Sequence, residues 1–350
     1  MGLAWFLLKE PAQLIINMEN KTKEFITLSY GSGGRLTSEL IETFREKLSN
    51  KILDELCDSA EFNIGKERVA FTTDSFVVRP LFFPGADIGK LAVCGTVNDL
   101  SMKGAIPLYL SLSFIIEEGL SFSVLEKVLN SVSFWAKKAR VKIVTGDTKV
   151  VGRREADELF INTAGVGIIP CKDIRISSKA KLGDLIIING PIAEHGLAVL
   201  EARQSLGFSS GIKSDCKNLN FEVQACLSVS KKISVLRDPT RGGLVSVLYE
   251  IAQASNLGIE IYEKEIPIKP RVRKICDILG LDPLYIANEG KFLCFVNESD
   301  AYKVKRALGR EAKIIGEVVS SHRKKVYLKT ILGSTRILLP LEAEQLPRIC

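Results

Sequence analysis

The sequence lacks several features from which metal-binding and membrane proteins are built. It has only two histidines, and its eight cysteines include no Cys-x-x-Cys pair, so the ligand spacings of zinc sites are missing. No apolar run is long enough to cross a membrane: the run from Leu3 to Leu8 is short and is followed by Lys9-Glu10-Pro11. The same run lacks a basic beginning and a cleavage site, which argues against a signal peptide.

Dense basic segments are also missing. The net charge of +7 is modest for 350 residues, and runs such as Arg323-Lys324-Lys325 are short, so nucleic acid binding is not indicated. Cysteines such as Cys94 and Cys294 stand in apolar runs, which is typical of small buried side chains. We therefore expect a protein of the reducing cytoplasm that does not rely on a disulfide framework.

The length and the pattern of apolar residues predict two domains. With 46% hydrophobic and 25% charged residues, the chain is able to bury a sizeable core. Helical and strand patterns alternate, which favours an α/β (α+β) architecture. Polar, turn-forming residues from Pro170 to Gly183 separate the halves. We expect a leader of residues 1–25, an N-terminal domain of 26–170, a C-terminal domain of 171–340 and a flexible tail of 341–350.

The leader is an accessory extension or reflects an upstream start, since Met18 opens a polar segment just before the first clear pattern. Apolar residues at helical spacing predict helices at about 37–48, 123–139, 193–202 and 243–255. Short apolar runs predict strands at about 69–73, 107–116, 141–145, 159–169, 185–189, 291–296 and 313–319, and a hairpin at 326–339.

Five aspartates stand at or near the ends of apolar segments, where loops carry chemistry. They are Asp58, Asp74, Asp99, Asp147 and Asp238. An isolated aspartate after a strand is more often a turn former or a helix cap. Several carboxylates at one rim, however, suit Mg²⁺, which takes oxygen ligands and keeps waters and substrate phosphates in its shell.

A glycine-rich loop, Gly31-Ser32-Gly33-Gly34, precedes the first predicted helix. Backbone N–H groups at a helix start are able to bind phosphate. The loop is neither a P-loop nor a dinucleotide fingerprint, so a flexible turn is an equal alternative.

Three further polar residues have two interpretations each. Lys149 is placed to stabilise developing negative charge, or it is a surface lysine at a strand end. Glu289 is a candidate base, or an ordinary acid in a turn. His195 is a site residue or a polar group at a helix start, and the second interpretation is favoured.

The chain ends in Pro347-Arg348-Ile349-Cys350, with nothing after the thiol. Chain ends are poorly ordered unless they are tied down, so such a thiol is able to carry a covalently bound group into a site. A cysteine also occurs at a chain end by chance, and the terminal residue alone does not decide between the two.

Four segments taken in order resemble the HypE family of hydrogenase expression/formation proteins, in the superfamily of aminoimidazole ribonucleotide synthetase, selenophosphate synthetase and thiamine monophosphate kinase. These segments are residues 145–151 (TGDTKVV), 237–243 (RDPTRGG), 287–290 (ANEG) and 347–350 (PRIC). The resemblance runs from about Ile26 to Cys350. The terminal cysteine separates HypE from its relatives in the superfamily. Tyr30 departs from the pattern, because the family often has histidine there.

The resemblance implies a two-domain PurM-like fold, with an N-terminal ATP-binding domain that forms a homodimer. It also implies a reaction in which the carbamoyltransferase HypF loads Cys350 with a carbamoyl group. ATP then drives dehydration of the S-carboxamide to an S-cyanate, and a HypC–HypD complex receives the cyano group on iron for the nickel–iron centre.

The resemblance further implies roles for individual residues. Cys350, Lys149 and Glu289 would be catalytic, with Glu289 as a base and Lys149 opposite negative charge. Four aspartates would hold Mg²⁺: Asp58, Asp74, Asp99 and Asp238. Nucleotide binding would fall to Gly31, Ser32, Gly33, Gly34, Thr73, Asn98, Asp147, Thr148 and Arg241.

Two alternatives stay open. One is an ATP-dependent kinase or synthetase that acts on a free small molecule, which would lose nothing when Cys350 is removed. The other is a non-enzymatic maturation factor whose terminal thiol presents a metal, which would need no nucleotide site.

Overall fold

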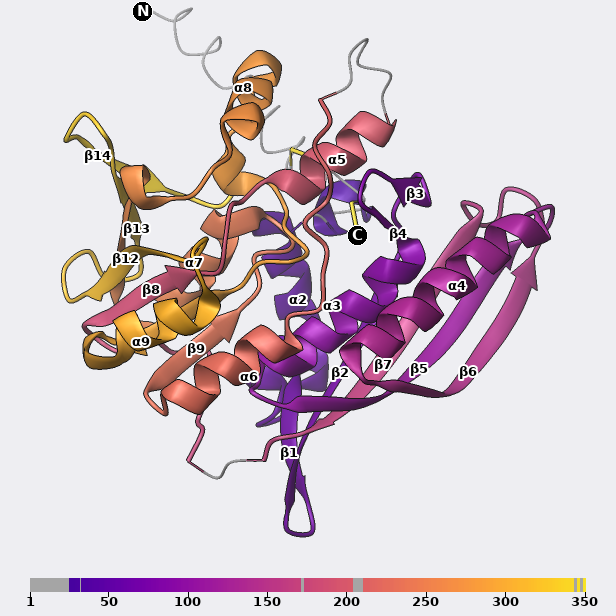
Figure 1. Cartoon of the computed structure of the whole chain (residues 1–350), viewed down its shortest axis with the longest axis horizontal. Coiled ribbons are helices and arrows are strands. Elements are labelled where there is room, and N and C mark those ends of the chain that lie inside the picture. Colours follow the sequence, from indigo (N-terminus) through magenta and orange to yellow (C-terminus); the bar gives the residue numbers. More distant parts are fainter. Residues whose placement is uncertain (1–24, 32, 171–172, 204–209, 343–344, 347–348) are drawn as a thin grey trace, which may run out of the picture.

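Two β-sheets and the helices around them make up the chain in the computed structural model (Figure 1). The structure describes residues 25–31, 33–170, 173–203, 210–342, 345–346 and 349–350. The predicted leader therefore lies outside the described residues, apart from Phe25. The first sheet belongs to the N-terminal half and the second to the C-terminal half, and the polar segment after Pro170 connects them.

The N-terminal sheet has the strand order β1-β2-β7-β5-β6. All neighbours are antiparallel except β5 and β6, which are parallel. The strands are β1 (Ala60–Ile64), β2 (Glu67–Phe76), β5 (Ile106–Glu117), β6 (Lys142–Val151) and β7 (Leu159–Ile168), and β3 (Phe82–Phe83) with β4 (Ala86–Asp87) forms a separate small hairpin.

Two helices cover one face of this sheet, α3 (Ile88–Met102) and α4 (Phe122–Ala139). Alternate residues of the strands point to this covered face, because side chains alternate across a strand. The opposite face, here called the outer face, keeps several large apolar side chains exposed. They include Phe71 on β2, Tyr109 and Ile115 on β5, and Val166 on β7.

The C-terminal sheet has the order β14-β13-β10-β12-β8-β11-β9, in which only β10 and β13 are parallel. Its strands are β8 (Asp184–Ile188), β9 (Ile233–Arg237), β10 (Gly258–Tyr262), β11 (Leu293–Asn297), β12 (Lys313–Val319), β13 (Val326–Lys329) and β14 (Thr335–Leu338). The helices of this half are α5 (Glu194–Arg203), α6 (Asn220–Val229), α7 (Gly243–Ser255), α8 (Pro270–Leu279) and α9 (Glu298–Leu308).

Helix α3 joins the two halves. It packs against β2 and β7 of its own sheet and against α6 and β9 of the other half. Most of its residues are buried, polar ones such as Thr96 and Asn98 included. One apolar cluster therefore runs through both domains, with Leu91 and Val97 from α3 and Leu197 from α5 among its members.

Helix α2 (Arg35–Leu48) is attached differently, since none of its residues is buried. Its apolar side chains Ile41, Phe44 and Leu48 remain exposed. Helix α2 and the outer face therefore both expose apolar side chains of the N-terminal half.

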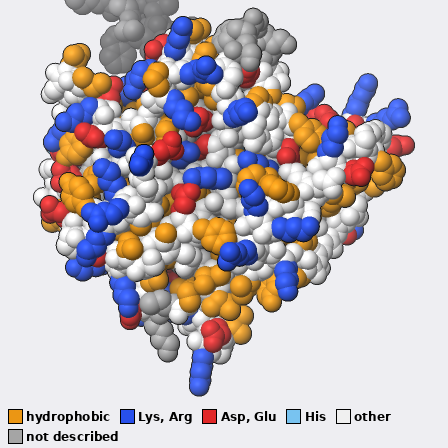
Figure 2. Space-filling view, viewed as in Figure 1, with side chains coloured by type: hydrophobic (Ala, Val, Ile, Leu, Met, Phe, Trp, Pro, Cys, Tyr) orange, Lys and Arg blue, Asp and Glu red, His pale blue; other side chains and the backbone are white. Residues whose placement is uncertain are grey.

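None of the described helices is sufficiently long and apolar to cross a membrane. Figure 2 shows lysine and arginine side chains scattered over one face among acidic and apolar groups, with no single basic patch there. Strands and helices occur in both halves, so the predicted α/β (α+β) architecture is confirmed.

Candidate active site at the domain junction

Four aspartates meet where the two domains touch, and we call them the acid patch: Asp58, Asp74, Asp99 and Asp238. Asp58 precedes β1 and Asp238 follows β9, as expected of loop residues. Asp74 lies within β2, which runs on to Phe76, and Asp99 lies within α3, so the expectation that these two stand at segment ends is wrong. At both positions a carboxylate interrupts the apolar pattern inside a regular element.

Hydroxyl groups and one arginine support the acid patch. The Thr72 hydroxyl lies 2.9 Å from Oδ2 of Asp99 and 3.0 Å from the carbonyl oxygen of Asp58. The Thr96 hydroxyl donates to Oδ2 of Asp74 at 3.0 Å. Nε of Arg237 lies 2.7 Å from Oδ1 of Asp58, while the other oxygen of Asp58 is buried without a hydrogen-bond partner among the described residues.

The acid patch carries more negative charge than its neighbours balance. Burial raises the pKa of Asp58 to about 6, against the pull of Arg237. Burial and the charges of the other three aspartates raise the pKa of Asp99 well above its usual range. The pKa of Asp74 and that of Asp238 are also raised, chiefly by burial. Such a cluster favours either protons or a bound cation.

The chemistry of the acid patch fits Mg²⁺ held together with a triphosphate. Among the described residues, no three histidine, cysteine, aspartate or glutamate side chains come close enough to hold a metal ion by themselves. Mg²⁺ commonly uses one or two carboxylates and completes its octahedron with waters and substrate phosphates. The unpartnered oxygen of Asp58 is a suitable ligand for such a shared shell.

The glycine loop lies against the C-terminal domain rather than in open solvent. Gly33 adopts φ +82°, and a side chain there would overlap Arg241, which lies 2.5 Å from the position of an added Cβ. Gly34 has the carbonyl oxygen of Leu341 at 2.4 Å from the same position. Glycine is required at both places because two other backbone segments approach closely. Ser32 lies outside the described residues.

One backbone donor of this loop, and that of the residue that follows it, already have partners. The N–H of Gly33 donates to the Thr37 hydroxyl at 2.8 Å, and the N–H of Arg35 donates to Leu341 at 2.9 Å. Gly31 has open space around it. Phosphate binding by residues 31–34 therefore stays a prediction, and it would require these contacts to change.

Asn98 connects the domains through its side-chain amide. Its Nδ2 group donates to the carbonyl oxygens of Lys217 (3.1 Å) and Glu289 (3.2 Å), and its Oδ1 accepts from the N–H of Leu219 (2.8 Å). These three contacts fix the loops that carry the candidate base. Thr73 is exposed and donates to the carbonyl oxygen of Thr163, so nothing in this structure assigns a nucleotide to either side chain.

Asp147 and Lys149 do not meet the acid patch of their own chain. They pair with each other at 2.9 Å, and both side chains are more than half exposed. Their neighbours on β5 are Ser113 and Ile115, so they lie on the outer face. Asp74 points to the covered face, where Thr96 of α3 meets it, so the two groups lie on opposite sides of one sheet.

Thr148 alternates to the other side of β6 and lies beside Phe114, on the helix-covered side of the sheet. Its side chain nevertheless is exposed, as is nearly all of β6. The motif at residues 145–151 therefore presents Asp147 and Lys149 to one face and Thr148 to the other. A ligand bound on one face of one chain would reach only part of it.

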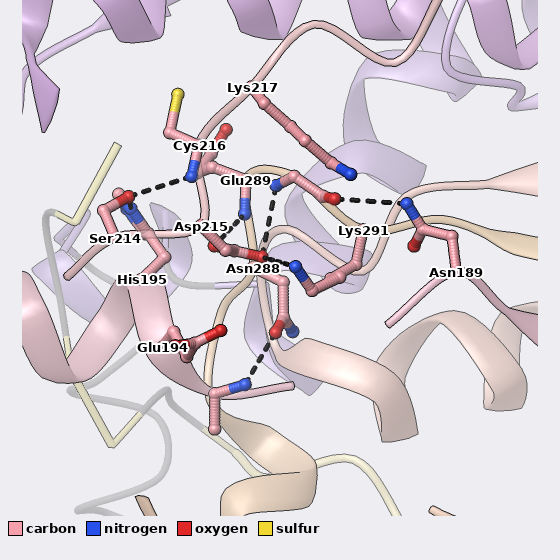
Figure 3. Close-up of polar contacts among 12 residues, drawn as sticks. Asn189, Glu194, His195, Ser214, Asp215, Cys216, Lys217, Asn288, Glu289 and Lys291 are labelled. Carbon is pink, nitrogen blue, oxygen red and sulfur yellow. Dashed lines mark hydrogen bonds and ion pairs between the residues drawn. The ribbon is translucent and has the colours of Figure 1, made fainter. Parts of the chain in front are cut away.

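Glu289 lies in the turn before β11, as predicted, and it is buried (Figure 3). Its backbone N–H donates to Oδ1 of Asp215 at 3.2 Å, and Oδ2 of Asp215 accepts from Gly290 at 3.3 Å. Lys291 completes this arrangement with an ion pair of 3.2 Å to Asp215. Burial, Cys216 and acidic neighbours that include Asp238 raise the pKa of Glu289 well above its usual range.

The end of the chain is docked in the same junction. Ile349 is buried, and Cys350 is half-buried, with an oxygen of its carboxylate accepting from the N–H of Val77 at 3.2 Å. Val77 follows the last residue of β2 and is three residues beyond Asp74, which is about 10 Å of extended chain. The visit of the thiol to the acid patch and the flexibility of the tail both stay predictions.

His195 is the residue whose role the sequence pattern concealed. It is fully buried near the start of α5, and its Nε2 lies 2.8 Å from the carbonyl oxygen of Ile349. A polar residue at a helix start was the favoured interpretation, and its position at that start is confirmed. The only available signal was a histidine between Glu194 and Gly196, which says nothing about a partner more than 150 residues away.

Known proteins share this two-domain arrangement. The family model for the N-terminal domain of AIR synthase related proteins matches residues 57–169, and the model for their C-terminal domain matches residues 181–329. These matches define the class of the two-domain fold as that of the AIR synthase related proteins.

Within this class the similarity is much higher to one group. A carbamoyl dehydratase HypE from Bradyrhizobium diazoefficiens is 47% identical over 332 residues, which cover 93% of this chain and 96% of the relative. The solved structure of a HypE–HypF complex has a TM-score of 0.82 at 45% identity, and covers 86% of this chain and 99% of that one. A HypE structure in complex with ATP has a TM-score of 0.78 at 45% identity, and covers 93% and 100%. The chain therefore belongs to the HypE family, and the predicted resemblance is confirmed.

Proposed function

We propose that this protein is an ATP-dependent carbamoyl dehydratase that acts on its own C-terminal cysteine. In this reaction the S-carboxamide on Cys350 becomes an S-cyanate, which supplies a cyanide ligand during maturation of a nickel–iron hydrogenase. The relatives at 43–47% identity that bear the name carbamoyl dehydratase support the reaction type.

The observation that carries the proposal is the docked chain end. The backbone of Cys350 contacts Val77, which directly follows β2. Strand β2 also provides Asp74 of the acid patch. A kinase acting on a free small molecule has no need to hold its own terminus in the site. A substrate tethered to the enzyme avoids the entropy cost of bringing two molecules together.

The chemistry requires the amide oxygen to become a leaving group. Transfer of the γ-phosphoryl group of ATP to that oxygen lets it depart as phosphate, and the nitrogen loses two protons as the C≡N bond forms. The bond from sulfur to carbon is kept throughout. The products are the S-cyanate, ADP, phosphate and the two protons, which pass to a base and to solvent, so all atoms are accounted for.

Glu289 is proposed to take a proton from the amide nitrogen. Its raised pKa makes the ionised carboxylate a stronger base than an exposed glutamate, which suits removal of a weakly acidic proton. Asn98 and Asp215 hold its backbone from two sides, so the side chain starts from a fixed position.

The acid patch is proposed to hold Mg²⁺ together with the triphosphate. The metal would neutralise the phosphates and align them for in-line transfer. The HypE relative solved in complex with ATP supports a nucleotide site in this protein. The candidates for nucleotide contacts stay the predicted ones, with Arg241 close to Asp74 and next to Gly33.

A second copy of the chain is proposed to complete the site. The outer face exposes apolar groups such as Tyr109, Ile115 and Val166, which a homodimer would bury. The same association would bring Asp147 and Lys149 of one copy to a site of the other. Lys149 would then face the transferring phosphoryl group.

Two protein partners follow from the family. A HypE relative forms a complex with HypF, which supports HypF as the carbamoyl donor here. A HypC–HypD complex is proposed as the acceptor of the cyano group. Because Cys350 must stay a free thiol before loading, the reducing cytoplasm is the proposed location.

Intact-mass analysis tests the proposal. The protein is incubated with HypF, carbamoyl phosphate and ATP, and a carbamoyl adduct should form on Cys350. The adduct should lose one water when this protein also has ATP and Mg²⁺ for its own step. The variant Cys350→Ala should carry no adduct.

Other outcomes would favour other functions. An adduct elsewhere on the chain would refute the assignment of Cys350. ATP turnover with a free small molecule that survives deletion of Cys350 would favour a kinase or synthetase. Tight metal binding at Cys350 without ATP hydrolysis would favour a metal-presenting factor.

A further inference from the structure

The docked chain end is held through its backbone. The carbonyl oxygen of Ile349 lies 2.8 Å from Nε2 of His195, and an oxygen of the Cys350 carboxylate accepts from the N–H of Val77 at 3.2 Å. Both contacts are made to main-chain atoms of the tail. A carbamoyl or cyano group on the sulfur therefore leaves both contacts chemically unchanged.

The surroundings of His195 determine which ring nitrogen carries the proton. Its Nδ1 lies 2.9 Å from the hydroxyl of Ser214, and that hydroxyl accepts from the N–H of Cys216 at 3.1 Å (Figure 3). The carbonyl oxygen of Ile349 can only accept, so the hydrogen bond to it places the proton of the imidazole on Nε2. In the neutral ring Nδ1 is then the unprotonated nitrogen, and it accepts from the hydroxyl of Ser214.

Burial keeps this imidazole neutral and immobile. The ring is fully buried, and the edge of Phe83 meets it with 5.5 Å between ring centroids. Burial lowers the pKa of His195, which Asp215 only partly offsets. A neutral ring fixed between a serine and a carbonyl group is a directional donor.

The segment that orients His195 also orients the candidate base. Ser214 sets the imidazole, and its neighbour Asp215 accepts from the backbone N–H groups of Glu289 and Gly290. Lys291 holds Asp215 through a buried ion pair. One short stretch of chain therefore fixes both the tail clamp and the turn that bears Glu289.

We propose that His195 is a positioning residue that clamps the penultimate carbonyl group and so presents the modified Cys350 to Glu289 and the acid patch. The inference rests on the proposed dehydration for its catalytic consequence. The clamp itself is a binding property of the chain end, and it can be measured without any reaction.

Two substitutions separate the hydrogen bond from the volume of the side chain. His195→Gln keeps an N–H donor at a similar distance from the backbone, whereas His195→Met fills the space without a donor. The exposed His322 provides a matched control. Its ring packs against Tyr327, and none of its described contacts is with the tail. His322→Met should behave like the wild type in every assay.

The first measurement is release of the terminal residue by a carboxypeptidase, with the full-length protein in its folded state. His195→Met should release Cys350 about tenfold faster, since one hydrogen bond that holds the end is lost. His195→Gln should stay within about threefold of the wild type. Equal release from all three proteins would overturn the clamp.

The second measurement is the rate of dehydration in a single turnover of protein that already carries the carbamoyl group. His195→Met should be about tenfold slower, with His195→Gln close to the wild type, and loading by HypF should be unchanged. A purely structural role would slow both variants equally and would lower their thermal midpoints together.

A further variant acts from outside the clamp. Ser214→Ala leaves the imidazole free to carry its proton on either nitrogen, so its release and dehydration rates should lie between those of the Met and Gln variants. Wild-type rates in Ser214→Ala would overturn the assignment of the proton to Nε2. If the wild type did not dehydrate the adduct at all, the proposed function would fail, while the carboxypeptidase result would still decide whether the clamp exists.

Discussion

The domain junction and strand β6 carry the two halves of the proposed site, and they differ in almost every physical respect. At the junction, Glu289, Asp215 and His195 are buried, and neighbouring groups hold their side chains or backbones. On β6, Asp147 and Lys149 are largely exposed and pair with each other. The junction is thus pre-organised by folding, whereas β6 presents its charged groups to solvent on the opposite side of the sheet.

This difference shows how much of the site one chain builds alone. Buried polar groups need partners inside the fold, and the junction provides them. Exposed ion pairs contribute little to stability, so the stability of the single chain does not explain why Asp147 and Lys149 lie on the outer face. A second copy that covers this face would give them both a setting and a role.

The largest effect is expected at the junction, from Glu289→Gln. The amide cannot accept the proton of the substrate nitrogen, so dehydration should fall by about 10²- to 10⁴-fold. The backbone contacts of residue 289 remain, and the variant should fold normally. Mass analysis should show a carbamoyl adduct that persists in the presence of ATP.

Loading by HypF serves as the control for this variant, since it precedes the step that Glu289 serves. If the adduct on Glu289→Gln lost water at the wild-type rate, the residue would not be the base, and the buried half of the site would have to be sought elsewhere.

The next effect tests whether β6 works across the dimer. Lys149→Met alone should slow dehydration by about 10²- to 10³-fold, through loss of a positive group opposite the phosphoryl oxygens. Cys350→Ser alone should be inactive. Mixed dimers that contain one copy of each, isolated with two different affinity tags, should regain activity at one of their two sites.

The recovery in mixed dimers is diagnostic because the active tail then sits in a chain without Lys149. Mixed dimers as inactive as their parents would mean that Lys149 serves its own chain. The contrast between a self-contained junction and a shared strand would then be wrong.

A smaller effect concerns the cost of the acid patch. Burial and three neighbouring aspartates raise the pKa of Asp99, so the charged carboxylate destabilises the ligand-free protein. Asp99→Asn removes this charge and should increase the free energy of unfolding by about 1–3 kcal/mol at pH 7. The same substitution should reduce the stabilisation given by Mg²⁺ and ATP. Urea denaturation with and without Mg²⁺ and ATP measures both, and a destabilised ligand-free variant would contradict the proposed repulsion.

The pH dependence gives an independent measure of the same repulsion. The pKa of Asp58 is about 6 in the folded state, above its ordinary value, so the folded chain binds more protons between pH 4 and 6. Its free energy of unfolding should fall relative to Asp58→Asn as the pH rises through this window, by about 1–3 kcal/mol. Urea denaturation at several pH values measures the free energy of unfolding of both proteins. A difference that stays constant with pH would show that the pKa of Asp58 is not raised.

The smallest effect on the folded chain is expected on the outer face. Tyr109→Glu places a charge on the surface that the homodimer would bury, so it should dissociate the dimer. The free energy of unfolding of the chain itself should change by less than about 0.5 kcal/mol. Phe122→Glu, on the exposed start of α4, is the matched control and should leave the dimer intact. Light scattering distinguishes them, and a dimeric Tyr109→Glu would remove the outer face from consideration.

The sequence predicted helices α2, α4, α5 and α7, and it missed α3, α6, α8 and α9. Helix α4 has one apolar stripe, and α7 begins and ends at the predicted residues, Gly243 and Ser255. Helix α3 was missed because the sheet and the C-terminal domain bury it on nearly all sides, so its sequence has no polar face to set a period. Asp99 consequently seemed to end an apolar segment.

The candidate site residues differ in how well the sequence could suggest them. Asp238 and Glu289 were suggested as candidates because each lies in a compact motif with a distinctive local sequence. The roles of His195 and Asn98 depend on contacts with segments more than 100 residues away, which neither spacing nor composition encodes. The contact of Ile349 with His195 is of the same kind.

The contact between Leu341 and the start of α2 gives the tail a fixed base, nine residues before its end. A reactant on so short a tether has an effective concentration in the millimolar range, whatever the amount of protein in the cell. Such a chain has no Michaelis constant for its own sulfur, and each copy processes one group per loading. The output of cyanide would then be set by how often a partner reloads the terminus, and the cell would regulate supply through the number of chains and the rate of loading.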